Sequence, residues 1–262
     1  GRAPAPGGPR GPMAALFSCC QEDKDVHGQE LSWVDDQAED LVNSPYKATM
    51  ASEAGGTAWK AARGQDGTSP SGSSERFRVT LSKPVGAKGI GVLMDPSDQV
   101  SLHICCLAEG SITDAYNRQA DVAEQLRVGD VILAVNHRGG SAALMAQDIL
   151  GSSRLELEVA RPATFTATLE KQGRTLGLEL NYVKQGLSLC VGMVREGGAA
   201  QRWNDAHPDL QITKNDRITA VCGCTGAPAE LMAALAKHEV LEVQVARAAV
   251  RGPAPEAEAL NL

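Results

Sequence analysis

The residues best suited to metal or redox chemistry in this sequence are its seven cysteines. Cys222-Gly223-Cys224 places two thiols one residue apart, and His238 follows along the chain, so this region offers at most three ligands where a closed zinc site needs four. Cys105-Cys106 is the other pair, but adjacent side chains on a strand point to opposite faces. We expect one of these two thiols to be buried in a core. A redox or zinc protein using Cys222 and Cys224 remains an alternative.

Other signatures of catalysis or nucleotide binding are missing from the sequence. The Gly89-x-Gly91 loop lacks the third glycine of a dinucleotide-binding loop and leads into a predicted strand instead of a helix. The sequence has no phosphate-binding Gly-x-x-x-x-Gly-Lys-Ser/Thr motif, no Gly-x-Ser-x-Gly and no His-Glu-x-x-His. No constellation of acid, base and nucleophile stands out. We therefore predict a protein that is not an enzyme and uses no cofactor or metal.

The composition favours a reduced protein that does not bind nucleic acid. Its 25 Lys+Arg against 32 Asp+Glu give a formal charge of −7, whereas nucleic-acid-binding domains are usually basic. An odd number of cysteines without framework spacing is typical of reduced intracellular proteins. No apolar run in the sequence reaches the length that a bilayer-spanning helix needs. These features predict a cytoplasmic protein.

Two copies of one unit follow each other in the chain. Leu126–Asn136 has the pattern of a Gly-Asp turn that leads into an apolar strand, and Ile212–Val221 is a weaker copy 86 residues later. The other anchors at this offset are a pair of loops and a pair of strands: Lys88–Val92 with Arg174–Leu178, and Leu155–Arg161 with Leu241–Arg247. Tyr116-Asn117 and Trp203-Asn204 match at an offset of 87, so one insertion or deletion lies between the anchors. The pattern predicts tandem domains of roughly 85 residues.

The same order of elements is predicted in each copy: strand, loop, two strands, short helix, buried strand, second helix, last strand. In the first copy these elements are Phe77–Leu81, Ile90–Met94, Val100–Leu107, Ser111–Asn117, Val131–Val135, Ala142–Leu150 and Leu155–Val159. In the second copy they are Phe165–Leu169, Leu176–Leu180, Leu187–Val194, Ala199–Asn204, Arg217–Val221, Pro228–Lys237 and Leu241–Val245. Only Pro162-Ala163-Thr164 links the copies, so we expect a constrained relative orientation.

This order of elements resembles the PDZ domain, as does the pairing of the Gly-Ile-Gly-Val loop with Leu-Arg-Val-Gly-Asp-Val-Ile-Leu-Ala-Val-Asn about 35 residues on. The resemblance covers roughly residues 77–161 and, less closely, 165–247. It implies a mainly β fold with two short helices per domain, arranged as two tandem, partly open β-barrels. The domains expected are a disordered acidic N-terminal arm at 1–75, PDZ-like domains at 76–162 and 164–247, and a flexible tail at 248–262.

PDZ domains bind the C-terminal tails of other proteins, and the resemblance implies the same role here. The tail would add as a strand beside Ile90–Met94, with its carboxylate held by backbone N–H groups of the glycine loop. The residues implied for the carboxylate are Lys88, Gly89, Ile90, Gly91 and Val92, and in the second copy Arg174, Leu176, Gly177 and Leu178. Those implied for the groove are Met94, Ala142 and Ile149, and in the second copy Leu180, Pro228, Met232 and Leu235.

These residues have a plainer interpretation as well. The apolar residues would form the core of any small β domain, and the basic residues would lie on the surface in contact with water. Under the resemblance, Lys88 or Lys83, and Arg174, would attract the carboxylate of the ligand.

Departures from the PDZ pattern bear on the ligand. Many PDZ domains that take Ser or Thr at the antepenultimate ligand position carry His where Ala142 and Pro228 stand, and neither of these can hydrogen-bond a hydroxyl. We therefore predict an apolar residue at that position and at the last position. Ala259–Leu262, the end of this chain, has the sequence Ala-Leu-Asn-Leu and fits the pattern, so its own C-terminus is a candidate ligand. The second copy has Asn215 in place of Gly129, and Asn tolerates the left-handed conformation.

Two features of the N-terminal arm suggest further contacts. Gln29–Val42 carries apolar residues at helical spacing, which predicts a short amphipathic helix that is marginal by itself. Cys19 and Cys20 beside Phe17 are candidates for reversible acylation, which would give peripheral membrane association. Two ordinary thiols in a tail are the alternative.

We conclude from the sequence that the chain is a tandem PDZ-like adaptor without catalytic activity. The competing hypothesis is a PDZ-like regulatory fragment of a larger enzyme, such as a protease or a kinase.

Overall fold

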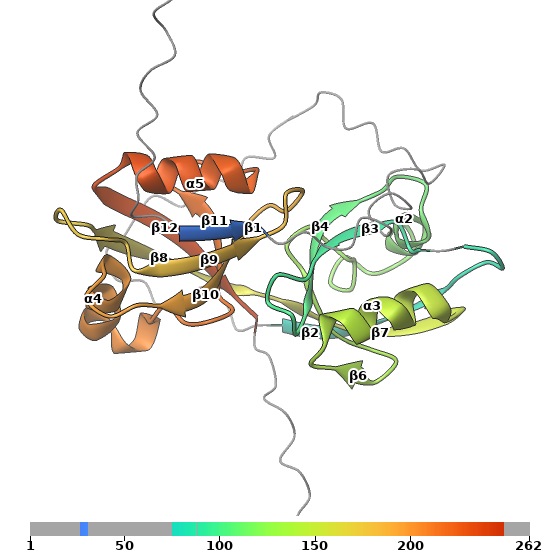
Figure 1. Ribbon diagram of the computed structural model, residues 1–262. Helices are drawn as coiled ribbons and strands as arrows, with labels where there is room; N and C mark the ends of the chain where they lie inside the picture. Colours follow the sequence, from blue (N-terminus) through green and yellow to red (C-terminus); the bar gives the residue numbers. More distant parts are fainter. Residues whose placement is uncertain (1–26, 31–74, 88, 249–262) are drawn as a thin grey trace, which may run out of the picture.

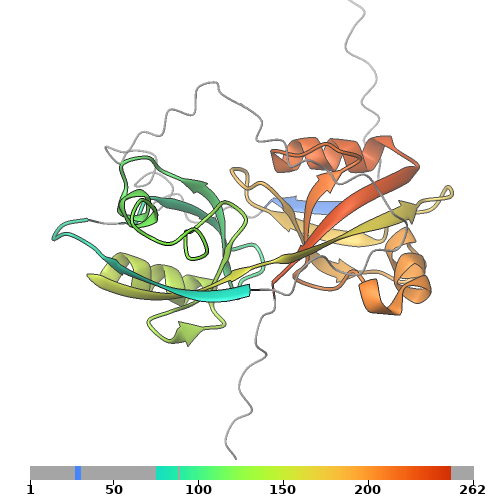
Figure 2. The ribbon, with the colours of Figure 1, turned by 180° about the vertical axis from the view of Figure 1, so that it is seen from behind.

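The computed structural model describes residues 27–30, 75–87 and 89–248, and it places them in two similar units (Figure 1). The first unit extends from Glu75 to Arg161 and the second from Ala163 to Arg247, with the short N-terminal strand added to the second. Figure 2 shows from behind that the last strand of the first unit leads directly into the first strand of the second. Only Pro162 separates these two strands. The fold is mainly β, with short helices, as the sequence predicts.

One antiparallel sheet forms the first unit, with the strand order β2-β7-β5-β4-β3 and β6 paired to β5. Its strands are β2 (Glu75–Ser82), β3 (Val92–Asp95), β4 (Leu102–Leu107), β5 (Val131–Val135), β6 (Arg138–Gly139) and β7 (Arg154–Arg161). Its helices are α2 (Ile112–Asn117) and α3 (Ala142–Gly151). Apolar and polar residues alternate along β2 and β7, so each strand can pack one face on the core while the other meets water.

The second unit repeats this connectivity and adds one strand. The sheet order is β1-β9-β10-β11-β12-β8, in which β1 comes from the N-terminal arm. The strands are β1 (His27–Glu30), β8 (Ala163–Glu170), β9 (Leu178–Tyr182), β10 (Leu189–Val194), β11 (Arg217–Val221) and β12 (Val240–Arg247). The helices are α4 (Ala199–Ala206), the 3-10 turn η1 (Pro208–Leu210) and α5 (Pro228–Lys237). Strand β1 runs parallel to β9, whereas the other pairs in this sheet are antiparallel.

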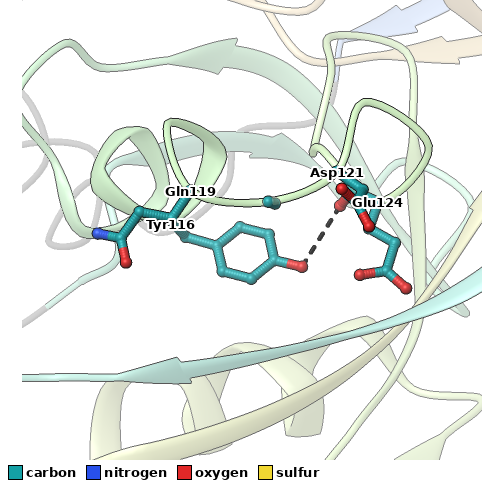
Figure 3. A pocket seen from close by; sticks show the side chains of 5 residues that line it. Tyr116, Gln119, Asp121 and Glu124 are labelled. Atoms are coloured by element: carbon teal, nitrogen blue, oxygen red, sulfur yellow. Dashed lines mark hydrogen bonds between the residues drawn. The ribbon is translucent and has the colours of Figure 1, made fainter.

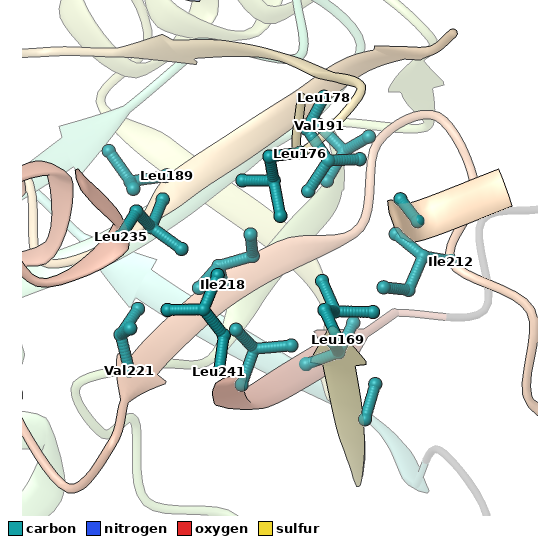
Figure 4. Packing of buried hydrophobic residues seen from close by; sticks show 14 of the residues in the cluster. Leu169, Leu176, Leu178, Leu189, Val191, Ile212, Ile218, Val221, Leu235 and Leu241 are labelled. Atoms are coloured by element: carbon teal, nitrogen blue, oxygen red, sulfur yellow. The ribbon is translucent and has the colours of Figure 1, made fainter. Parts of the chain in front are cut away.

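Each unit has its own core of aliphatic side chains. In the second unit Leu176, Leu178, Val191 and Ile218 meet Leu235 from α5 (Figure 4). The equivalent cluster of the first unit contains Val79, Leu81, Ile90, Val92, Leu102, Ile104, Leu126, Ile132, Val135, Ala142, Met145, Ile149, Leu155, Leu157 and Val159. Because aromatic residues make up only 3% of the chain, branched aliphatic packing supplies nearly all of this burial.

A pair of asparagines explains why the anchors at residues 116–117 and 203–204 repeat. The Asn117 side chain donates to the carbonyl of Leu126 at 2.8 Å and accepts from the N–H of the same residue at 2.9 Å. Asn204 makes the same two bonds to Ile212, at 2.8 and 2.7 Å. Each asparagine therefore fixes the start of the turn before the buried strand, so the extra residues between helix and turn do not disturb its position.

The turn itself follows the expectation drawn from the sequence. Gly129 has φ of +95° and Asn215 has φ of +71°, so asparagine does occupy the left-handed position in the second copy. The aspartates that follow stabilise the turn from within. Asp130 accepts from the N–H of Arg127 at 2.8 Å, and Asp216 accepts from the N–H of Thr213 at 2.7 Å.

A buried ion pair joins the two units. Nη1 of Arg217 on β11 lies 2.6 Å from Oδ2 of Asp95 at the end of β3, and the two side chains are 1% and 0% exposed. Asp98 adds a second carboxylate at 3.9 Å from Nη2 of the same guanidinium. Arg217 stands 86 residues after Val131, which is apolar and buried in the first unit. The guanidinium is therefore a feature of the contact between units and not of the repeated domain.

The structure departs from the sequence analysis in two places near the ligand-binding elements. Strand β3 begins at Val92 and not at Ile90, because Gly91 adopts φ of +79° and breaks the extended backbone. Gln29 and Glu30 belong to β1, so the helix predicted for Gln29–Val42 is wrong at its start, where pairing with β9 decides the conformation. Residues 31–42, the cysteines at 19 and 20, and the tail from 249 lie outside the described residues. None of the described helices is long and apolar enough to span a membrane.

Candidate functional site

The glycine loop before β3 is held against the helix that follows β4. The N–H of Ala108 donates to the carbonyl of Gly91 at 2.8 Å, and Thr113 donates to the carbonyl of Ile90 from both its N–H at 3.2 Å and its hydroxyl at 2.9 Å. These carbonyls therefore face inward. Within the described part of the chain, the N–H groups of Ile90 and Gly91 donate to no backbone carbonyl. Successive N–H groups of this kind form an anion-binding concavity.

The loop of the second unit has the same construction. The carbonyl of Gly177 accepts from the N–H of Arg195 at 2.8 Å, and that of Leu176 accepts from the N–H of Ala200 at 3.0 Å. Leu176 and Gly177 likewise donate to no backbone carbonyl among the described residues. Because the loop forms in both units, its geometry belongs to the repeated domain.

Glycine is required in both loops by close packing. A Cβ at Gly91 would lie 2.1 Å from the Cβ of Ser111, the N-cap residue of α2. A Cβ at Gly177 would lie 2.7 Å from the Cα of Gly198, at the start of α4. Both glycines also have positive φ, at +79° and +74°. The loop can therefore approach the helix start only with glycine at this position.

The apolar residues predicted to line the first groove come together in the structure. Ile90, Val92, Ala142 and Ile149 belong to one buried cluster, with Met94 packed against it. Their exposure is 2% or less, apart from Met94, which is half-buried. These side chains therefore form part of the core of the unit. The backbone edge of β3 beside them is the part of the predicted groove that a ligand can reach.

The second set of predicted groove residues is placed similarly. Leu176, Leu178, Leu180 and Leu235 lie in the core cluster of the second unit, and Met232 is packed against it. Pro228 is buried at the first position of α5, where its missing N–H costs nothing. Ala146, which stands 86 residues before Met232, is 4% exposed on α3 and was missed by the sequence analysis. The repeat offset itself would have identified it.

Lys83 does not serve as a carboxylate attractor, which corrects one expectation. Its ammonium donates to the carbonyls of Ile149 and Leu150 at 2.5 and 2.8 Å and so satisfies the C-terminal end of α3. Burial lowers the pKa of this group from its ordinary value. Lys171 bonds in the same way to the carbonyl of Ala236 in α5, at 3.1 Å. Arg174 is exposed beside its loop, whereas Lys88 lies outside the described residues.

The two outer edges of the glycine-loop strands differ. Among the described strands β3 pairs only with β4, so its other edge carries no described partner. The corresponding edge of β9 is paired with β1 over four positions, from His27 opposite Glu179 to Glu30 opposite Tyr182. Among the described residues, the repeated unit therefore has this edge unpaired in one copy and paired in the other.

Polar and sulfur groups surround the ion pair between the units. Burial and the nearby Arg217 hold the pKa of His103 well below its ordinary value, so His103 is neutral at pH 7. Burial, reinforced by Asp95, raises the pKa of the Cys105 thiol to about 12. Cys105 is buried, as expected for one thiol of the pair, but it faces this contact and the backbone of Leu187 instead of an apolar core.

The other features considered, the cysteines and a surface hollow, are not part of the glycine-loop site. In the described ranges, no group of three or more His, Cys, Asp and Glu side chains could hold a metal ion. Cys222 is exposed in a turn with φ of +49°. A hollow of about 330 Å³ beside α2 is lined by Tyr116, Gln119, Ala120, Asp121 and Glu124 (Figure 3), where the Tyr116 hydroxyl donates weakly to the carbonyl of Glu124 at 3.5 Å. Its lining residues belong to α2 and to the extra residues that follow this helix.

Comparison with known proteins gives matches among solved structures only. No family model and no curated protein matches the sequence. The chain is similar to INAD PDZ45 in complex with an NG2 peptide, at 18% identity and a TM-score of 0.32, covering 73% of this chain and 100% of the other. It is also similar to INAD PDZ45 in complex with NORPA CC-PBM, at 16% identity and a TM-score of 0.30, covering 66% and 92%. The element order, the glycine loop and the turn before the buried strand each occur twice in the described residues, which is the arrangement expected from the resemblance to tandem PDZ domains.

Proposed function

We propose that the first domain binds the C-terminal tails of other proteins by strand addition to β3. The observation that carries this proposal is the strand β1 on β9, because it shows the equivalent edge of the same unit extended by another segment. An open edge presents unpaired N–H and C=O groups, which is the property that strand addition uses.

The glycine loop supplies the second half of the recognition. A tail that runs antiparallel to β3 brings its terminal carboxylate to the N-terminal end of that strand, next to the N–H groups of Ile90 and Gly91. Backbone donors in a fixed loop bind an anion without reorganising, and hydrogen bonds to charged groups are the stronger kind. A free C-terminus is therefore preferred over an internal segment in this domain.

The side chains beside the groove favour an apolar ligand. Ala142 opens α3 with a methyl group where a hydroxyl-binding side chain would be needed for Ser or Thr. Ala146 on α3 and Met94 on β3 are also apolar; Ala146 is buried and Met94 is half-buried. We propose tails with apolar residues at the last and antepenultimate positions, a class that includes this chain's own terminus, although residues 259–262 lie outside the described residues.

Binding of labelled peptides to the full chain, followed by fluorescence anisotropy, tests the proposal. The peptides end in Ala-Leu-Asn-Leu with either a free or an amidated carboxyl group, and a third ends in Ala-Leu-Asn-Asp. Saturable binding is expected only for the first peptide. Equal binding of the amidated peptide would contradict carboxylate recognition by the loop.

Tryptophan substitutions assign the binding site. Ala146→Trp fills the groove of the first domain, and the neighbouring Gln147→Trp places the same ring on the exposed face of α3. Only the first change is expected to abolish binding. The corresponding pair in the second domain, Met232→Trp and Ala233→Trp, shows whether any signal comes from α5. Far-UV circular dichroism of each variant checks that the fold is retained.

A further inference from the structure

In the second unit, the outer edge of β9 is paired with a segment of the chain itself. Figure 1 and Figure 2 both show β1 between α5 and β9, the place where a peptide ligand would lie in the first domain. Pairing extends over all four residues of β1, with Gly28 opposite Leu180 and Gln29 opposite Asn181. β9 is thereby an internal strand of a sheet of six strands.

We propose that residues 27–30 are a built-in ligand of the second domain, which this domain recognises as an internal, parallel strand and not as a C-terminus. This proposal goes beyond peptide binding by the first domain and does not depend on it. It gives the two copies different roles: the first domain is free to take external tails, while the second holds the chain's own N-terminal arm.

The direction of β1 separates this contact from recognition of a tail. A terminal carboxylate reaches the glycine loop only when the ligand runs antiparallel to β9, whereas β1 runs parallel and has residues on both sides of it. It therefore offers no terminal carboxylate to the N–H groups of Leu176 and Gly177. The contact relies on the backbone ladder, and parallel pairing is slightly less stable per residue than antiparallel pairing.

An external peptide would have to pair with the same edge of β9 that β1 occupies. A strand can have only one partner on each side, so an external peptide and β1 exclude each other on β9. Because β1 is part of the same chain, its local concentration near β9 does not fall on dilution. The second domain is therefore closed at any protein concentration, and an external ligand must displace β1 to enter.

Amide hydrogen exchange measured by NMR on the full chain tests the proposal without any peptide. The variant Gly28→Pro/Gln29→Pro removes the N–H groups of two successive residues of β1, so the ladder is broken whichever residue faces β9. The control Ala51→Pro/Ser52→Pro makes the same change elsewhere in the arm. Alternate amides of Leu178–Tyr182, those facing β1, are expected to exchange about tenfold faster or more in the first variant only.

Three outcomes would overturn the proposal. The β9 amides that face β1 could exchange at the same rate in the wild type and in Gly28→Pro/Gln29→Pro. The control variant could accelerate them equally, which would make the effect unspecific. Protection could also increase with protein concentration, which would mean that β1 pairs with another copy. The outer amides of β3 provide an internal reference, because their exchange is expected to be the same in all three proteins.

Discussion

Replacing Asp95 with Asn is expected to open the contact between the two domains. Arg217 and Asp95 are almost completely buried at 2.6 Å, and removing one charge of such a pair costs about 3–5 kcal/mol because the other charge stays desolvated. Asp98 at 3.9 Å still compensates part of the charge, so we expect about 3 kcal/mol, the lower end of that range. Separation of the domains relieves this cost, because water then reaches Arg217.

Alkylation of Cys105, resolved by mass spectrometry, measures this opening. In the docked protein the thiol is 8% exposed and its pKa is raised to about 12 by burial and by Asp95, so it reacts only when the domains separate. A change of about 3 kcal/mol corresponds to a rate increase of about a hundredfold. Cys222, which is exposed, should react at the same rate in every variant.

Matched variants separate this effect from general damage. Arg217→Met should accelerate labelling of Cys105, whereas Arg195→Met breaks an exposed ion pair with Glu179 and should leave it unchanged. The double variant Asp95→Leu/Arg217→Leu should restore slow labelling, because a buried pair replaced by apolar side chains is often neutral. Less than a threefold increase for both single changes would refute the reasoning, since the pair would then contribute nothing to docking.

The other predictions concern the loop, a buried carboxylate and the end of a helix. Gly91→Ala should lower the free energy of unfolding in urea more than Gly86→Ala, because both have positive φ but only the first places a Cβ against Ser111. Burial raises the pKa of the Asp130 carboxyl from 3.8 to about 6. The contribution of this carboxyl to the free energy of unfolding is therefore fully present at low pH, where the group is protonated, and is lost as the pH rises through about 6. The stability of Asp130→Asn relative to the wild type should therefore rise between about pH 4 and 6 in urea titrations, and a flat difference would contradict this. Lys83→Met should destabilise the first domain by about 1–3 kcal/mol in the same assay, because two carbonyls at a helix end lose their donor; an unchanged urea midpoint would count against it.

Much of the fold was predictable because its determinants are local and occur twice. The helix Pro228–Lys237 and the strand Arg217–Val221 have the bounds that the sequence predicts, since proline, aliphatic spacing and turn residues mark their ends. The left-handed turn at Asn215 was predictable from its equivalence to Gly129. The start of β3 was not predictable, because the loop at Gly91 packs against Ser111 and delays the strand to Val92, a contact that sequence patterns do not show.

The sequence by itself determined the repeated unit: its alternating strands, its glycine loop and its asparagine-anchored turn. Those features depend on residues near in the chain or on one repeated pattern. Tertiary structure decided how the copies differ. Lys83 caps a helix, Arg217 reaches Asp95 across the contact between domains, and residues 27–30 pair with β9. Each of these contacts joins residues far apart in sequence, and its free energy comes from burial and backbone pairing that exist only after both partners have folded.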